Sequence, residues 1–140
     1  MENMKTAVDA YKSAQVDAAV LGASPYELVA MLFAKAIEFT NEAKTHMLNG
    51  DINAKGHAIK LAAAIITDGL RGSLNMEEGG EIAQNLDVLY EYMTTQLVKA
   101  HAENNTEILD EVVTLLSNVK GGWDGIKPEQ PVQSEAQPQP

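Results

Sequence analysis

Apolar side chains recur at steps of three and four residues through most of the chain, with polar side chains between them. This spacing places the apolar side chains along one face of an α-helix. No segment shows the alternation of apolar and polar residues, bounded by hairpin turns, that is typical of a half-buried β-strand. The pattern therefore predicts an all-α fold.

The first predicted helix begins at the sequence Ser24-Pro25-Tyr26-Glu27. Ser24 can cap the helix, Pro25 suits the first helical position because it lacks an N–H, and Glu27 completes a capping box. The segment Asn49-Gly50-Asp51 supplies a C-terminal glycine and a new N-cap, which predicts a tight helical hairpin. The apolar positions of this helix are Leu28, Met31, Leu32, Phe39, Ala43 and Met47.

Three further helices are predicted from the same periodicity, and together they predict an antiparallel four-helix bundle over residues 21–124. The second spans about 52–74 and carries Ile59, Ala62, Ala63, Ile65, Ile66 and Leu70. The third follows a polar turn around Asn75 and Gly79-Gly80 and carries Ile82, Leu86, Leu89, Met93, Leu97 and Ala100. The fourth is capped within 104–107 and carries Leu109, Val112, Leu116, Val119 and Trp123. Gly121-Gly122 predicts that its end frays.

The two ends of the chain differ from this pattern. Residues 1–20 contain Val8, Tyr11 and Val16 but only weak caps, which predicts a short helix or adaptable arm that docks on the bundle. Residues 125–140 are rich in Pro, Gln and Glu and contain few large apolar side chains. Such a segment cannot bury enough surface to offset the entropy of ordering, so we expect a disordered tail.

Composition narrows the class of protein. The 140 residues fit one domain, and the absence of cysteine excludes disulfides and thiol chemistry and fits a reducing compartment. A net charge of −10 with scattered Lys and Arg argues against nucleic acid and lipid surfaces as partners. The first residues lack the basic and apolar regions of a signal peptide, and no apolar run approaches the length of a membrane-spanning helix. We expect a soluble, cytoplasmic protein.

Residue patterns for catalysis are missing. The sequence has no glycine-rich phosphate loop, no nucleophile elbow and no Glu-x-x-His pair for a di-iron centre. Glu38, Glu42 and His46 share a helical face that is able to bind a divalent ion, although a solvated face explains the row better. His57 and His101 are expected at the surface or at helix ends. We therefore predict no enzyme activity, no cofactor and no metal.

Three stretches carry a resemblance to a known family: Leu70-Arg71-Gly72-Ser73-Leu74-Asn75, Gly79 to Leu86, and Leu89-Tyr90-Glu91-Tyr92-Met93. Together with Ala10-Tyr11, Ala23-Ser24-Pro25 and Trp123 they resemble the FliS family of flagellin-specific secretion chaperones, over about residues 10–123. The resemblance implies a four-helix bundle without enzyme activity. It also implies binding of the disordered C-terminal segment of flagellin, delay of its polymerisation, and help in presenting it to the flagellar export gate.

The implied binding surface lies between the second and third predicted helices, in the mode in which an amphipathic segment lies in a groove. Individual apolar members are explained as readily by core packing. Asn85 and Tyr90 are distinct because a polar side chain beside an apolar seam needs a hydrogen-bond partner. The candidate flagellin-binding residues are Tyr11, Ile59, Ala62, Ile66, Leu70, Ile82, Asn85, Leu86, Leu89 and Tyr90.

Some alternatives stay open at this point. The arm around Tyr11 either covers part of the groove until flagellin displaces it or is a fixed packing element. A non-flagellar helical adaptor or a self-associating interaction module would share the bundle, and a homodimer is left open. A metal-binding or catalytic bundle ranks third.

Overall fold

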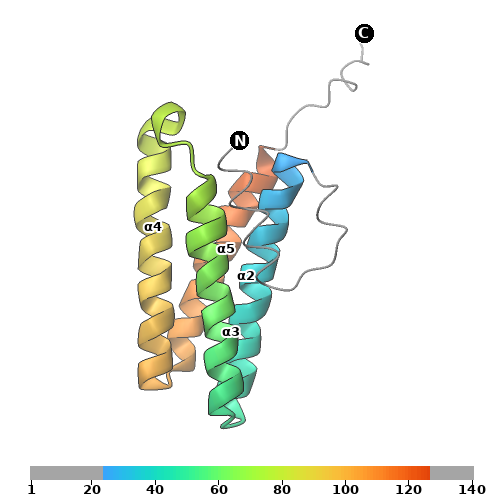
Figure 1. Cartoon of the computed structure of the whole chain (residues 1–140), viewed down its shortest axis with the longest axis vertical. Helices are drawn as coiled ribbons and strands as arrows, with labels where there is room; N and C mark the ends of the chain where they lie inside the picture. Colours follow the sequence, from blue (N-terminus) through green and yellow to red (C-terminus); the bar gives the residue numbers. More distant parts are fainter. Residues whose placement is uncertain (1–23, 127–140) are drawn as a thin grey trace.

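The computed structural model describes residues 24–126, which form four long helices arranged as an antiparallel bundle (Figure 1). The helices are α2 (Pro25–Leu48), α3 (Ile52–Ala64), α4 (Met76–Glu103) and α5 (Thr106–Gly125). Each helix packs against the next in the chain, and α2 also packs against α5, which closes the ring. Residues 24–126 contain no strand. The all-α prediction is confirmed, whereas the predicted arm and most of the predicted tail lie outside the described residues.

The caps read from the sequence are present at the predicted residues. The Ser24 hydroxyl accepts a bond from the Glu27 amide at 3.1 Å, and the Glu27 carboxylate accepts one from the Ser24 amide at 3.1 Å. Gly50 adopts a φ of 74°, which glycine reaches without a Cβ clash. Asp51 then caps α3 by accepting from the Ala54 amide at 3.1 Å. These local signals fix the start of α2 and its turn into α3.

The core consists of the apolar stripes that the periodicity predicted, with one clear exception. Most predicted stripe residues are buried or half-buried. Ile82 is 73% exposed, so the prediction that it belongs to the core seam of the third helix is wrong. It lies near the N-terminal end of α4, which begins at Met76.

The segment after α3 departs from the regular helix predicted over 52–74. A π-helical turn, η2 (Ile65–Leu70), follows Ala64, and a short 3₁₀ turn, η3 (Arg71–Ser73), completes the segment. The wider turn places Ile65, Ile66, Gly69 and Leu70 all on the buried side. Ser73 donates to the Gly69 carbonyl at 2.6 Å.

The start of α4 also differs from the prediction. The helix begins at Met76, capped by Asn75, and is interrupted at Gly80 with φ 56° and ψ −133°. A side chain at this left-handed φ would be strained, so glycine is required there. The predicted turn around Gly79-Gly80 is thus an interruption within the helix rather than its beginning.

A buried lysine ties α3 to the turn between α4 and α5. Lys55 is 5% exposed, and its ammonium donates to the Asn104 side-chain carbonyl at 2.9 Å and to the His101 carbonyl at 3.3 Å. Asn104 has a φ of 53°, a conformation that asparagine tolerates better than most residues. A cation at the C-terminal end of α4 is also favourable for the helix dipole. This contact holds the end of the bundle at which α4 turns into α5.

Candidate functional site

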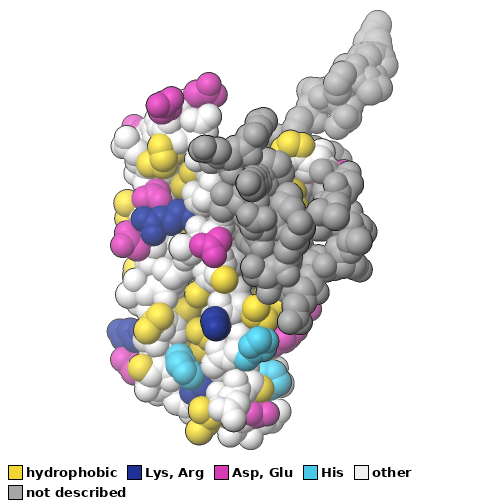
Figure 2. All heavy atoms as spheres, in the orientation of Figure 1, with side chains coloured by type: hydrophobic (Ala, Val, Ile, Leu, Met, Phe, Trp, Pro, Cys, Tyr) yellow, Lys and Arg dark blue, Asp and Glu magenta, His cyan; other side chains and the backbone are white. Residues whose placement is uncertain are grey.

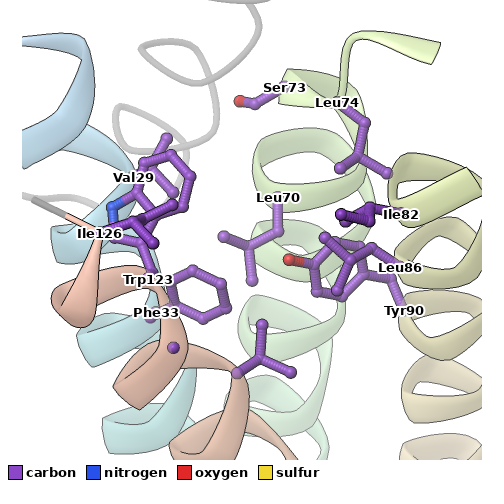
Figure 3. A pocket seen from close by; sticks show the side chains of 12 residues that line it. Val29, Phe33, Leu70, Ser73, Leu74, Ile82, Leu86, Tyr90, Trp123 and Ile126 are labelled. Atoms are coloured by element: carbon purple, nitrogen blue, oxygen red, sulfur yellow. The ribbon is translucent and has the colours of Figure 1, made fainter. Parts of the chain in front are cut away.

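An open apolar pocket lies at the end of the bundle where α5 ends and α4 begins (Figure 3). Its volume is about 390 Å³, within the range of about 300–1,000 Å³ that is typical of ligand sites. None of the described residues that line it carries a charge. The lining residues are Val29, Phe33, Leu70, Ser73, Leu74, Ile82, Leu86, Tyr90, Val119, Gly122, Trp123 and Ile126.

The walls of this pocket come from α2, α4 and α5 and from the turns that follow α3. Two of its large side chains, Ile82 and Ile126, are 73% and 65% exposed, whereas Phe33 is 1% exposed. The pocket is therefore apolar from a buried floor to a solvent-exposed rim. Acidic side chains gather at the end of the molecule where α4 begins (Figure 2), where Glu77 and Glu78 form its first turn.

The wall formed by α2 and α5 is held by a reciprocal contact between Tyr26 and Trp123. The Tyr26 hydroxyl donates to the Trp123 carbonyl at 3.1 Å, and the Trp123 indole N–H donates to the Tyr26 carbonyl at 3.2 Å. The two rings are stacked with centroids 5.2 Å apart. These contacts fix the last turn of α5, which remains helical to Gly125. The predicted fraying at Gly121-Gly122 is wrong for this reason.

The opposite wall is held by an ion pair between η3 and α4. Arg71 donates two hydrogen bonds to the Asp87 carboxylate. Its Nε donates to Oδ1 at 2.5 Å, and a terminal guanidinium nitrogen donates to Oδ2 at 3.2 Å. Glu91 lies 3.7 Å from the same guanidinium. The hydrogen bond from Arg71, helped by its charge, holds the pKa of the Asp87 carboxyl below its usual value. The pair fixes the turn that carries Leu70, Ser73 and Leu74 to the pocket.

The depressed pKa of Asp87 predicts a pH dependence. A carboxyl with a lowered folded-state pKa stabilises the fold above its unfolded pKa of about 4, and that stabilisation is lost as the pH falls through the folded pKa. Asp87→Asn should therefore have a lower Tm than the wild type at pH 7. The difference should shrink as the pH falls below about 4, as measured by thermal unfolding followed by circular dichroism. If the same pH-dependent difference persists in an Arg71→Gln background, the ion pair is not its source.

The structure brings four of the predicted site residues together in the pocket: Leu70, Ile82, Leu86 and Tyr90. Ile59, Ala62 and Ile66 are at most 5% exposed and belong to the core. Leu89 is half-buried against the core, and Asn85 is exposed on α4. Tyr11 lies outside the described residues, so its place and the role of the arm stay predictions.

Sequence reasoning missed the contribution of α2 and α5 to the pocket. Val29 and Phe33 are one helical turn apart and lie one position beyond the predicted stripe of Leu28 and Leu32. The two adjacent apolar stripes make the apolar face of this helix wider than one neighbouring helix can cover. This width was the feature of the sequence from which a second contact surface could have been predicted. Trp123 was predicted as an apolar position of the fourth helix, but nothing in the sequence alone indicates that it lines the same pocket as Ile82.

The described residues offer little for metal or bond-making chemistry. Within residues 24–126 no group of three or more His, Asp or Glu is placed to hold a metal ion. Of the predicted row, Glu38 pairs with Lys35 at 3.1 Å. His57 and His101 are exposed. In this part of the chain no helix is long and apolar enough to cross a membrane.

Comparison with known proteins gives one consistent answer. A family model described as "Flagellar protein FliS" matches residues 7–130. The chain is 41% identical over 126 residues to the flagellar secretion chaperone FliS of Vibrio cholerae, covering 90% of this chain and 92% of that protein. It is 41% identical over 122 residues to FliS of Salmonella typhimurium, covering 87% and 90%. It is 44% identical over 120 residues to the flagellar secretion chaperone FliSB of Pseudomonas aeruginosa, covering 86% and 94%.

Proposed function

The chain belongs to the FliS family of flagellar secretion chaperones, and from this premise we propose that it binds the C-terminal segment of flagellin in the apolar pocket. Binding in the cytoplasm delays flagellin polymerisation and assists delivery of flagellin to the flagellar export apparatus. The chain acts as a chaperone, not as an enzyme, as expected for this family.

The observation that carries the proposal is the pocket itself, which is open and has no charged side chain among the described residues that line it. A folded protein rarely leaves contiguous apolar surface in contact with water unless that surface binds a partner. Here Ile82 and Ile126 form an exposed apolar rim above the buried Phe33 and Leu70. Apolar anchors of an amphipathic segment, spaced i, i+3 or i+4, suit a hollow of this kind.

The chemistry of flagellin, the proposed client of this chaperone, explains why such a site is needed. A flagellin terminus that packs into a filament has apolar stripes, and these stripes aggregate if they meet before assembly. Ordering a disordered client costs about 2–5 kcal/mol or more, and complexes of this type bury about 1,000–3,000 Å². One pocket of about 390 Å³ is too small for that area. The client therefore extends beyond the pocket over the neighbouring bundle surface.

The predicted binding residues within residues 24–126 divide into three groups under this proposal. Leu70, Ile82, Leu86 and Tyr90 contact the client directly in the pocket. Leu89 and Asn85 lie on α4, where an extended client passes. Ile59, Ala62 and Ile66 contribute by packing the helices that carry the pocket.

The test is a calorimetric titration of the full chain with flagellin and with flagellin lacking its C-terminal segment. Full-length flagellin should bind with measurable heat, and the truncated protein should bind much more weakly. Equal binding of the two proteins, or binding of neither, would overturn the proposal. Mixing the chaperone with flagellin before inducing polymerisation should also lengthen the lag phase seen by light scattering.

A further inference from the structure

The hydroxyl of Tyr90 lacks the kind of hydrogen bond that the hydroxyls of the other two tyrosines in the described region make. The Tyr26 hydroxyl donates to the Trp123 carbonyl, and the Tyr92 hydroxyl donates to Glu111 at 2.7 Å. The Tyr90 hydroxyl has no hydrogen-bond partner among residues 24–126. Yet Tyr90 is only 3% exposed. A buried hydroxyl without a partner is costly and uncommon in folded proteins.

The surroundings of Tyr90 direct this hydroxyl into the pocket. The ring extends from α4 toward the middle of the hollow with the oxygen at its leading end (Figure 3). Phe33 lies beside it, with ring centroids 6.4 Å apart and planes inclined by 49°. Leu70 and Leu86 line the same hollow. A tyrosine hydroxyl is protonated at neutral pH and available as a donor, and burial raises the pKa of Tyr90 further above its ordinary value.

We propose that the Tyr90 hydroxyl is the polar anchor of this pocket and donates a hydrogen bond to a free main-chain carbonyl of the bound flagellin segment. This inference rests on the proposed function, because it takes flagellin as the occupant. Apolar contacts supply most of the affinity, and the hydroxyl selects the position at which the segment enters. A fully apolar occupant would leave the hydroxyl without a partner in the complex, as it is among residues 24–126 of the free chain.

The acceptor restricts the conformation of the client in the pocket. In the middle of an α-helix every main-chain carbonyl is already bonded within the helix, and only the last four are free. A continuous helix lying sideways in the pocket offers Tyr90 only the second lone pair of carbonyls that are already bonded, as the Ala36 carbonyl accepts from Thr40 at 2.8 Å within α2. A carbonyl without a helical bond is the better acceptor, so we expect the flagellin segment to end a helix there or to pass through in an extended or turn conformation.

The decisive variant is Tyr90→Phe, which removes one oxygen atom and keeps the ring that packs on Phe33. If the hydroxyl is unpaired in the free chaperone and paired in the complex, the variant should bind flagellin about 3- to 12-fold more weakly. Its Tm in the absence of flagellin should be unchanged or higher. If the hydroxyl instead made a hydrogen bond that only stabilises the fold, the variant would have a lower Tm and an unchanged affinity for flagellin. Tyr92→Phe, which removes a hydroxyl on the same helix outside the pocket, is the matched control and should leave affinity within about twofold.

Double-mutant cycles test whether the acceptor is a main-chain or a side-chain group. Tyr90→Phe is combined in turn with alanine substitutions of each polar side chain in the flagellin C-terminal segment. No coupling to any side chain is expected, because the acceptor is in the main chain. Coupling to one side chain would overturn the main-chain assignment. Equal affinity of wild type and Tyr90→Phe, or a drop in Tm of the free variant, would overturn the whole inference. Absence of flagellin binding by the wild type would instead refute the proposed function.

Discussion

Ile82→Glu should lower the affinity for flagellin by about 10- to 100-fold while leaving the bundle as stable as the wild type. Ile82 is 73% exposed at the rim of the pocket, so its side chain contributes little to the core. Burying an isoleucine under a client is worth about 1.5–3 kcal/mol, and a glutamate in its place must also be desolvated.

Val98→Glu is the matched control for this prediction. Val98 is 63% exposed on the same helix, and it does not line the pocket. The substitution makes the same change of charge, so it separates a local effect from the effect of a more acidic protein. Calorimetric titration with flagellin should show an affinity within about twofold of wild type. Similar losses for Val98→Glu and Ile82→Glu would contradict a localised role of the pocket.

The order and approximate bounds of the helices could be predicted because local signals specify them. The capping box at Ser24 and Glu27 and the turn at Gly50 and Asp51 depend only on neighbouring residues, and the structure has both as predicted. The π-helical turn at Ile65–Leu70 could not be predicted in this way. It depends on how much apolar surface α2 and α4 offer to that segment, which is a property of the packed bundle.

The pocket was harder to predict, because periodicity treats a core position and a binding position alike. Ile82 and Met93 follow the same stripe on the third predicted helix, yet Ile82 is 73% exposed and Met93 is fully buried. What separates them is whether another helix covers that level of the bundle. Tyr90 was the exception, because a polar group beside an apolar seam needs a hydrogen-bond partner, and the sequence therefore predicted a binding role for it.

The largest effect on stability is expected for Phe33→Ala. Phe33 is 1% exposed, and its ring packs near Tyr90 on the floor of the pocket. Truncation of a buried phenylalanine to alanine typically costs about 3–5 kcal/mol, since it removes apolar burial and leaves a cavity. Urea unfolding followed by circular dichroism should give that decrease in the free energy of unfolding. Here the cavity adjoins an open pocket, so relaxation or water entry should keep the loss near the lower end of the range.

Val29→Ala is the control for this variant, because Val29 lies one turn earlier on α2 and lines the same pocket but is only half-buried. It should cost about 1 kcal/mol, in proportion to the smaller apolar surface that it removes. A loss below about 1 kcal/mol for Phe33→Ala would show that its ring is not part of the packed core. If both predictions hold, the floor of the pocket is constrained by folding, whereas the rim at Ile82 is free to change with the client. Differences in client preference among related chaperones should then arise at the rim, because substitutions there alter binding without destabilising the bundle.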